Sequence, residues 1–145
     1  MRVVTSPLAR CVETAALLGF ADAAREPRLV EMDWGEWEGR SLQELRAQLG
    51  EAMRENEARG LDFMPPGGET PRMVGARVQS WLREIARDGV PTLAVTHRGV
   101  IRAILAQASG WDMRAKPPFK LDWGAAHLFA LDGGGKPSVL ALNVT

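Results

Sequence analysis

Residues Thr92–Leu105 read TLAVTHRGVIRAIL, and this stretch decides the fold class. Its first five residues form an apolar run of strand length, and apolar side chains recur at helical spacing after Gly99. The stretch predicts a buried strand over Thr92–Thr96, a turn at His97 and a helix over Val100–Ala108. The histidine therefore stands where a strand ends and where a helix exposes unpaired N–H groups.

A second unit of the same form stands at the start of the chain. Arg2–Thr5 reads RVVT, a β-branched run that predicts a strand. Ser6 is a candidate N-cap and Pro7 suits the first turn of a helix, in which Arg10 lies about one turn along. The two units suggest two parallel strands, each followed by a helix.

The rest of the chain continues the pattern and then ends in a hairpin. The apolar positions Leu42, Leu45, Leu49 and Met53 predict a single helix that ends at Gly60, and a cap and proline start the next helix, which Gly89 ends. Two final strands are expected at Ala126–Leu131 and Ser138–Asn143. This order predicts an α/β three-layer sandwich with a mainly parallel, mixed sheet flanked by helices.

Composition limits the range of functions. The 145 residues fit one domain, and the 18 basic and 18 acidic residues cancel, which argues against nucleic-acid and membrane-surface partners. Cys11 is the only cysteine, so no internal disulfide is possible and a cytoplasmic location is expected. No Cys/His cluster has metal-ligand spacing and no cofactor motif is present, so neither a metal nor a cofactor is expected.

The two strand-turn-helix units place polar groups together. Ligands in open α/β sheets bind at the carboxyl ends of the strands, where helix N-termini favour anions. Ser6 and Arg10 from one turn, with His97 and Arg98 from the other, predict a phosphate pocket. Each residue alone has a simpler interpretation: a capping serine, a solvated arginine, and a histidine satisfied by the backbone.

Glu31 is a candidate proton donor. It precedes a loop with Trp34 and Trp37, and apolar surroundings disfavour an ionised carboxyl group. The alternative is an ordinary surface carboxylate beside tryptophans that cover the core edge. His127 lies inside an expected strand, which favours a structural role.

Four segments together resemble the histidine phosphatase superfamily, also called the phosphoglycerate mutase-like family. They are VVTSPLARCVETA at Val3–Ala15, LVEMDWGEWEG at Leu29–Gly39, PPGGET at Pro65–Thr70 and AVTHRGVIRA at Ala94–Ala103. The resemblance runs from residue 2 to the end and implies a single domain over residues 1–145.

The resemblance implies roles at matching positions. Arg10 would bind phosphate, Glu31 would be the general acid/base, and His97 would be a cationic histidine against the phosphoryl oxygens. The substrate-binding group would comprise Ser6, Arg98, Gly99, Glu69 and Thr70, the last two at the pocket mouth.

One family feature is not found in the sequence. The family's nucleophile is a histidine in an Arg-His-Gly signature, and neither His97 nor His127 stands in that context. The chain resembles the family from its second strand onward, so the expectation is an N-terminally incomplete domain without the first strand, the first helix and the nucleophile. Without that strand, the strand over Thr92–Thr96 would have an unpaired edge.

The expected function is hydrolysis of a small phosphomonoester through phosphohistidine chemistry, without a metal. Because the nucleophile is not in the sequence, the alternative is a catalytically inactive module that binds phosphate esters. A further alternative is an interaction protein whose strand edge pairs with another chain, including a second copy in a homodimer.

Overall fold

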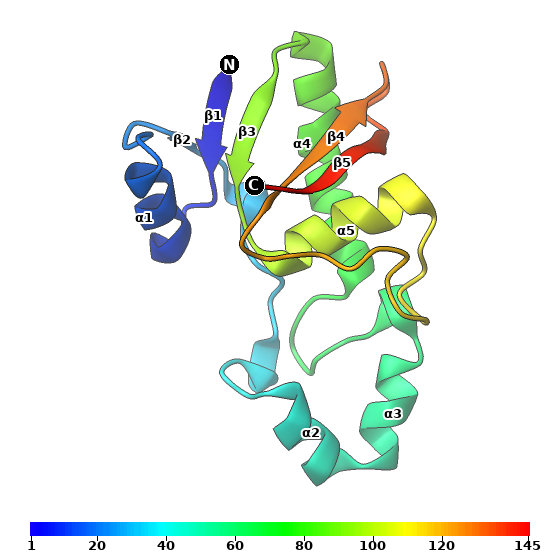
Figure 1. Cartoon of the computed structure of the whole chain (residues 1–145). Helices are drawn as coiled ribbons and strands as arrows, with labels where there is room; N and C mark the ends of the chain where they lie inside the picture. Colours follow the sequence, from blue (N-terminus) through cyan, green and yellow to red (C-terminus); the bar gives the residue numbers. More distant parts are fainter.

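The computed structural model describes all 145 residues, and a small parallel sheet lies in the upper half of Figure 1. The strand β1 (Arg2–Thr5) pairs on one side with β3 (Thr92–Val95) and on the other with the two-residue β2 (Ala24–Arg25). All three strands are parallel, in the order β2-β1-β3. The parallel pairing of β1 and β3 brings the carboxyl ends of both strands to the same edge.

Helices flank this sheet. The helix α1 (Ala9–Leu17) packs against β1 and β3, while α4 (Pro71–Asp88) packs against α5 (Arg98–Ser109). The side chain of Thr70 caps α4 by accepting a hydrogen bond from the N–H of Met73 (3.1 Å). The predicted α/β class, with a parallel sheet flanked by helices, is therefore confirmed.

The final hairpin forms a ladder of its own. The strands β4 (Ala126–Leu131) and β5 (Pro137–Val144) pair antiparallel and β5 packs against α5, but neither strand pairs with β3. The β3 strand therefore has one unpaired edge, as predicted, but all its residues are half-buried rather than buried. These residues are partly exposed because no strand covers that edge.

The single helix predicted from Leu42 to Gly60 is wrong. Gly50 has φ +54°, outside the helical region, and it separates α2 (Leu42–Leu49) from α3 (Glu51–Glu57). Leu45 and Met53 are buried, whereas Leu42 and Leu49 are exposed. The apolar stripe is shared between two short helices, because the chain must turn to bury its inner positions.

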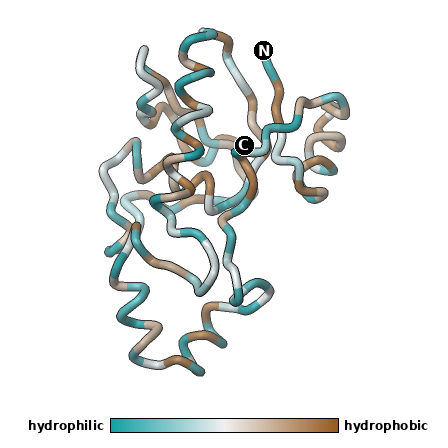
Figure 2. The backbone as a smooth tube through the Cα atoms, turned by 180° about the vertical axis from the view of Figure 1, so that it is seen from behind, coloured by the Kyte–Doolittle hydropathy of each residue, from teal (hydrophilic) through white to brown (hydrophobic).

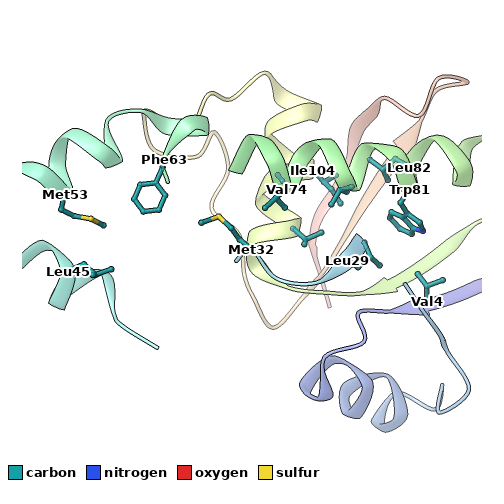
Figure 3. Packing of buried hydrophobic residues seen from close by; sticks show 13 residues of the cluster. Val4, Leu29, Met32, Leu45, Met53, Phe63, Val74, Trp81, Leu82 and Ile104 are labelled. Atoms are coloured by element: carbon teal, nitrogen blue, oxygen red, sulfur yellow. The ribbon is translucent and has the colours of Figure 1, made fainter. Parts of the chain in front are cut away.

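The core is one continuous cluster that joins the sheet to α2 and α3. Figure 3 shows Met32 between a sheet-side group and the outlying group of Leu45, Met53 and Phe63. The cluster comprises Val4, Leu29, Met32, Leu45, Met53, Phe63, Val74, Val78, Trp81, Leu82, Val100, Ala103 and Ile104. The loop that carries Met32 therefore links both ends of the molecule through apolar contact.

The distribution of hydropathy agrees with this packing. Figure 2 shows hydrophilic and hydrophobic segments alternating along α2 and α3, typical of helices that bury one face. None of the helices combines the length and the apolar character needed to cross a membrane.

Candidate active site

The two predicted turns meet in the structure. The Oγ atom of Ser6, after β1, lies 2.8 Å from Nε2 of His97, after β3, and both side chains are buried. The N–H of Ser6 also donates to the carbonyl of Val95 (2.8 Å), which continues the parallel pairing into the turns. Residues 91 positions apart in the chain thus share one polar cluster.

The side chain of His97 does not cap the helix that begins after this residue. His97 is the N-cap residue of α5, but its side chain makes no capping hydrogen bond. Its Nε2 atom lies 3.4 Å from Sγ of Cys11, which is also buried. The contacts of the His97 ring are thus with the side chains of Ser6 and Cys11 and not with the backbone, against the simpler interpretation of a histidine satisfied by the backbone.

Arg10 lies in the first turn of α1, beside this cluster. Its side chain is exposed, and its positive charge helps to lower the pKa of His97. Burial raises the pKa of the Cys11 thiol, and the charge of Arg10 only partly opposes this. The guanidinium takes part in none of the eight ion pairs of the protein. Arg10 is therefore an unpaired cation at the edge of the Ser6–His97 cluster.

The pKa of His97 lies below its ordinary value of 6.5. Burial is the main cause, and the positive charges of Arg10 and Arg77 add to it, against the opposite effect of Glu31. The imidazole therefore favours the neutral form until an anion enters the cluster. A bound phosphate dianion would reverse this preference and draw a proton onto the ring.

This shift predicts a pH dependence of stability. The unfolded chain binds the His97 proton more readily than the folded chain, so the free energy of unfolding should decrease as the pH falls below about 6.5. The His97→Gln variant should lose this part of the dependence. Urea unfolding at a series of pH values on both sides of 6.5 measures the effect. If the free energy of unfolding of both proteins depended on pH to the same extent, the prediction would be contradicted.

Glu31 lies at the N-terminus of α5. Its Oε1 atom accepts a hydrogen bond from the N–H of Met32 (2.8 Å), and its Oε2 atom accepts one from the N–H of Gly99 (3.4 Å). A Cβ atom at position 99 would overlap Oε1 of Glu31. Gly99 therefore makes room for the carboxylate, and its N–H is already occupied by Glu31.

Arg77 was not predicted and is the main organiser of the Glu31 loop. It donates to the carbonyls of Arg28 (2.6 Å) and Glu31 (3.3 Å), and it forms a two-pronged ion pair with Glu69 (3.0 Å for both bonds). Burial alone would raise the pKa of Glu69, but hydrogen bonds from Arg77 and from the N–H of Asp33 lower it overall. No local sequence signal distinguishes Arg77 from the other arginines of its helix.

Replacing Arg77 with methionine should lower the free energy of unfolding by about 2 kcal/mol. The reason is that Glu69 and two loop carbonyls would lose their donors together. The exposed Arg83, on the same helix, is the matched control, and Arg83→Met should change stability by less than about 0.5 kcal/mol. Equal urea midpoints for the two variants would show that the Arg77 network contributes nothing.

The remaining predicted residues lie around the same region. Glu69 and Thr70 are engaged with Arg77 and with the N-terminus of α4, respectively, and neither lines the neighbouring pocket. Arg98 is exposed on the first turn of α5 and does line that pocket. The substrate-binding roles of these residues remain predictions.

The pocket next to Glu31 has a volume of about 480 Å³. Glu31 and Gly99 belong to both the pocket wall and the N-terminus of α5, so the pocket adjoins the His97 cluster. The sequence did not point to several of its lining residues. The full lining comprises Glu31, Met32, Trp34, Leu42, Glu57, Gly60, Phe63, Pro71, Arg98, Gly99, Arg102, Met113 and Trp123.

The side chains that commonly bind metals are dispersed. No three of the His, Cys, Asp and Glu residues gather in an arrangement that could hold a metal ion. The chemical character of the region comes instead from guanidinium, imidazole, hydroxyl and carboxylate groups. These groups suit recognition of an oxyanion and transfer of a proton.

The fold and the site define an α/β protein in which a serine and a histidine meet at the carboxyl edge of a parallel sheet. The profile of the histidine phosphatase superfamily (branch 1) matches residues 1–145, and the chain belongs to that superfamily. The predicted family is thus confirmed.

The chain is similar to phosphoglycerate mutases and to a bifunctional protein. The chain is 31% identical over 138 residues to the 2,3-bisphosphoglycerate-dependent phosphoglycerate mutase of Beijerinckia indica, covering 88% of this chain and 66% of the relative. It is 29% identical over 148 residues to a bifunctional protein of Mycobacterium tuberculosis, covering 99% of this chain and 40% of that protein. The chain therefore spans less than two thirds of the length of these relatives.

Solved structures support the fold. YhfR of Bacillus stearothermophilus superposes with a TM-score of 0.81 at 23% identity, over 99% of this chain and 74% of that chain. A mycobacterial glucosyl-3-phosphoglycerate phosphatase in complex with inorganic phosphate gives a TM-score of 0.78 at 20% identity, over 100% and 77%. The predicted phosphoglycerate mutase-like fold is confirmed.

Proposed function

We propose that these residues bind the phosphoryl group of a small phosphomonoester and carry the acid/base group for its hydrolysis. The contact of 2.8 Å between Ser6 and His97 is the observation that supports this most directly, because it joins the two turns into one cluster. Arg10 would hold two phosphoryl oxygens, and His97, protonated on binding, would hold another. No metal is needed for this recognition.

Glu31 is suited to the proton transfers of such a reaction. It stands between the His97 turn and the pocket, where the leaving group of a bound ester would lie. As an attacking histidine forms its bond to phosphorus and the P–O ester bond breaks, Glu31 would give a proton to the leaving oxygen. Its carboxylate would then take a proton from the water that attacks the phosphoenzyme.

The covalent step needs a histidine that attacks phosphorus. Nε2 of His97 is engaged with Ser6, and Nδ1 of His127 accepts a hydrogen bond from the N–H of Asn143 (3.1 Å). Neither histidine stands in an Arg-His-Gly sequence. We therefore propose that the 145 residues supply binding and proton transfer but do not form the phosphohistidine.

Calorimetry and turnover on the 145-residue chain test this proposal. Inorganic phosphate should bind with uptake of a proton, and p-nitrophenyl phosphate should be hydrolysed no faster than background. His97→Gln should weaken the binding and abolish the proton uptake. Rapid turnover that requires His97 would overturn the division of roles, and absence of phosphate binding would overturn the whole proposal.

A second candidate function is that of an interaction module, and the unpaired edge of β3 supports it. An extended segment of another chain, or of a second copy, could pair with this edge. Sedimentation measured across a range of concentrations would reveal a homodimer.

The buried thiol of Cys11 fits a reducing compartment, so we place the protein in the cytoplasm.

A further inference from the structure

The pocket beside Glu31 is where the rest of a bound ester would lie, and its wall indicates what that group is. Trp34 and Phe63 pack edge to face with ring centroids 5.5 Å apart, and both line the pocket. With a volume of about 480 Å³, the pocket has room for a ring and its substituents. Flat apolar groups bind well against such aromatic walls.

Most polar side chains of the pocket carry a charge. They are two carboxylates and two guanidinium groups, and none is a Ser, Thr, Asn, Gln or Tyr. The aromatic and charged side chains together favour a leaving group that combines an apolar ring with a charged group.

The charges of the pocket are not balanced. Glu57 is neutralised by a two-pronged ion pair with Arg46 (2.8 Å for both bonds), and Glu31 accepts N–H hydrogen bonds at the start of α5. Arg98 and Arg102 form no ion pair. Neither guanidinium group therefore makes direct contact with a carboxylate, although the charge of Glu31 acts on Arg102.

Arg102 is the better placed of the two for a ligand. It is half-buried, and its guanidinium lies 5.2 Å from the ring centroid of Trp111. The indole N–H of Trp111 donates to the carbonyl of Ala115 (3.0 Å), which holds the ring in place. Burial lowers the pKa of Arg102, and the opposite effect of the negative charge of Glu31 does not offset it.

We propose that the leaving group of the substrate is an aromatic ring that carries a second anionic group. The ring lies against Trp34 and Phe63, and the anion pairs with the guanidinium of Arg102. This assignment of a substrate class rests on the proposed function, because it takes the ester phosphate to occupy the Ser6–His97 cluster. Arg98, 5.3 Å from the ring centroid of Trp123, stands at the same wall as a second, exposed cation.

Three phosphonates test the assignment, because a phosphonate cannot be hydrolysed and binding is measured whether or not the chain is active. Methylphosphonate probes the Ser6–His97 cluster alone, benzylphosphonate adds the ring, and para-carboxybenzylphosphonate adds the second anion. Calorimetry should show about tenfold tighter binding on adding the ring and about tenfold more on adding the carboxylate.

Two variants assign each gain to its residues. Arg102→Gln should remove the gain from the carboxylate and leave the gain from the ring, whereas Trp34→Ala should reduce the gain from the ring. The exposed Arg87 on α4 is the matched control, and Arg87→Gln should change neither gain. The ligand series on the unmodified chain decides the question even if Trp34→Ala fails to fold.

The outcomes separate this inference from the proposed function. If methylphosphonate binds but the ring and the carboxylate add no affinity, the substrate class is wrong, whereas phosphate binding at the Ser6–His97 cluster is supported. If the carboxylate gain persists in Arg102→Gln, its assignment to Arg102 is wrong. If none of the three ligands binds, both the proposal of phosphate binding at the Ser6–His97 cluster and the proposed substrate class are overturned.

Discussion

An alanine at Gly35 is expected to lower the free energy of unfolding by about 3 kcal/mol, a large part of the stability of a small domain. Gly35 has φ +51°, in the left-handed region, and an added Cβ atom would overlap the carbonyl oxygen of Pro66. It would also lie 2.6 Å from backbone atoms of Gly67 and Gly68. Backbone atoms cannot swing aside as a side chain can, so the two loops would have to separate.

That separation would also affect the pocket. The N–H of Glu36 donates to Pro66 (2.9 Å), and the N–H of Glu69 donates to Asp33 (2.8 Å), so the two loops are bonded on both sides of Gly35. Trp34 belongs to one of these loops and lines the pocket. Gly35→Ala should therefore weaken the binding of benzylphosphonate more than that of methylphosphonate.

Gly39 is the matched control for this substitution. It has φ +79° but no atom within 4 Å of the position of an added Cβ. Gly39→Ala should therefore cost only the conformational penalty, about 1 kcal/mol. Urea unfolding of both variants measures the difference, and equal losses would show that the contact between the loops contributes no stability.

Replacing Arg10 with glutamine should weaken the binding of inorganic phosphate about a hundredfold, which is the largest functional effect that we expect. A guanidinium can donate two charge-assisted hydrogen bonds to phosphate, and glutamine offers neither the charge nor the fork. The side chain of Arg10 is exposed and takes part in no ion pair, so its removal should change stability by less than about 0.5 kcal/mol.

The result would separate a role in binding from a role in folding. Arg87→Gln, an equivalent change of charge on the exposed face of α4, should leave phosphate affinity within about twofold. If Arg10→Gln binds phosphate as tightly as the unmodified chain, Arg10 is a solvated surface residue. That outcome would contradict the proposal that Arg10 supplies the main cation for phosphate binding at the Ser6–His97 cluster.

The local patterns predicted those parts of the structure that depend on neighbouring residues. The strand at Thr92, the turn at His97 and the helix after it follow from alternation, capping and helical spacing within a few residues. The meeting of Ser6 and His97 was also predictable, because adjacent parallel strands bring their carboxyl ends to one edge. The same local rules failed at Gly50, where burial of Leu45 and Met53 required a turn within an apolar stripe.

The amino-acid sequence by itself determined the α/β class and the cluster of Ser6, Arg10 and His97, because these depend on short-range periodicity and on the geometry of parallel strands. The superfamily was indicated by the resemblance of four sequence motifs to a known family. Only the tertiary structure decided that Arg77 organises the Glu31 loop, that Gly99 makes room for a carboxylate, and that Arg102 stands unpaired beside an aromatic pocket. These features depend on contacts between residues tens of positions apart. Such contacts leave no periodic trace in the chain, because a side chain finds its partner only when the whole core has packed.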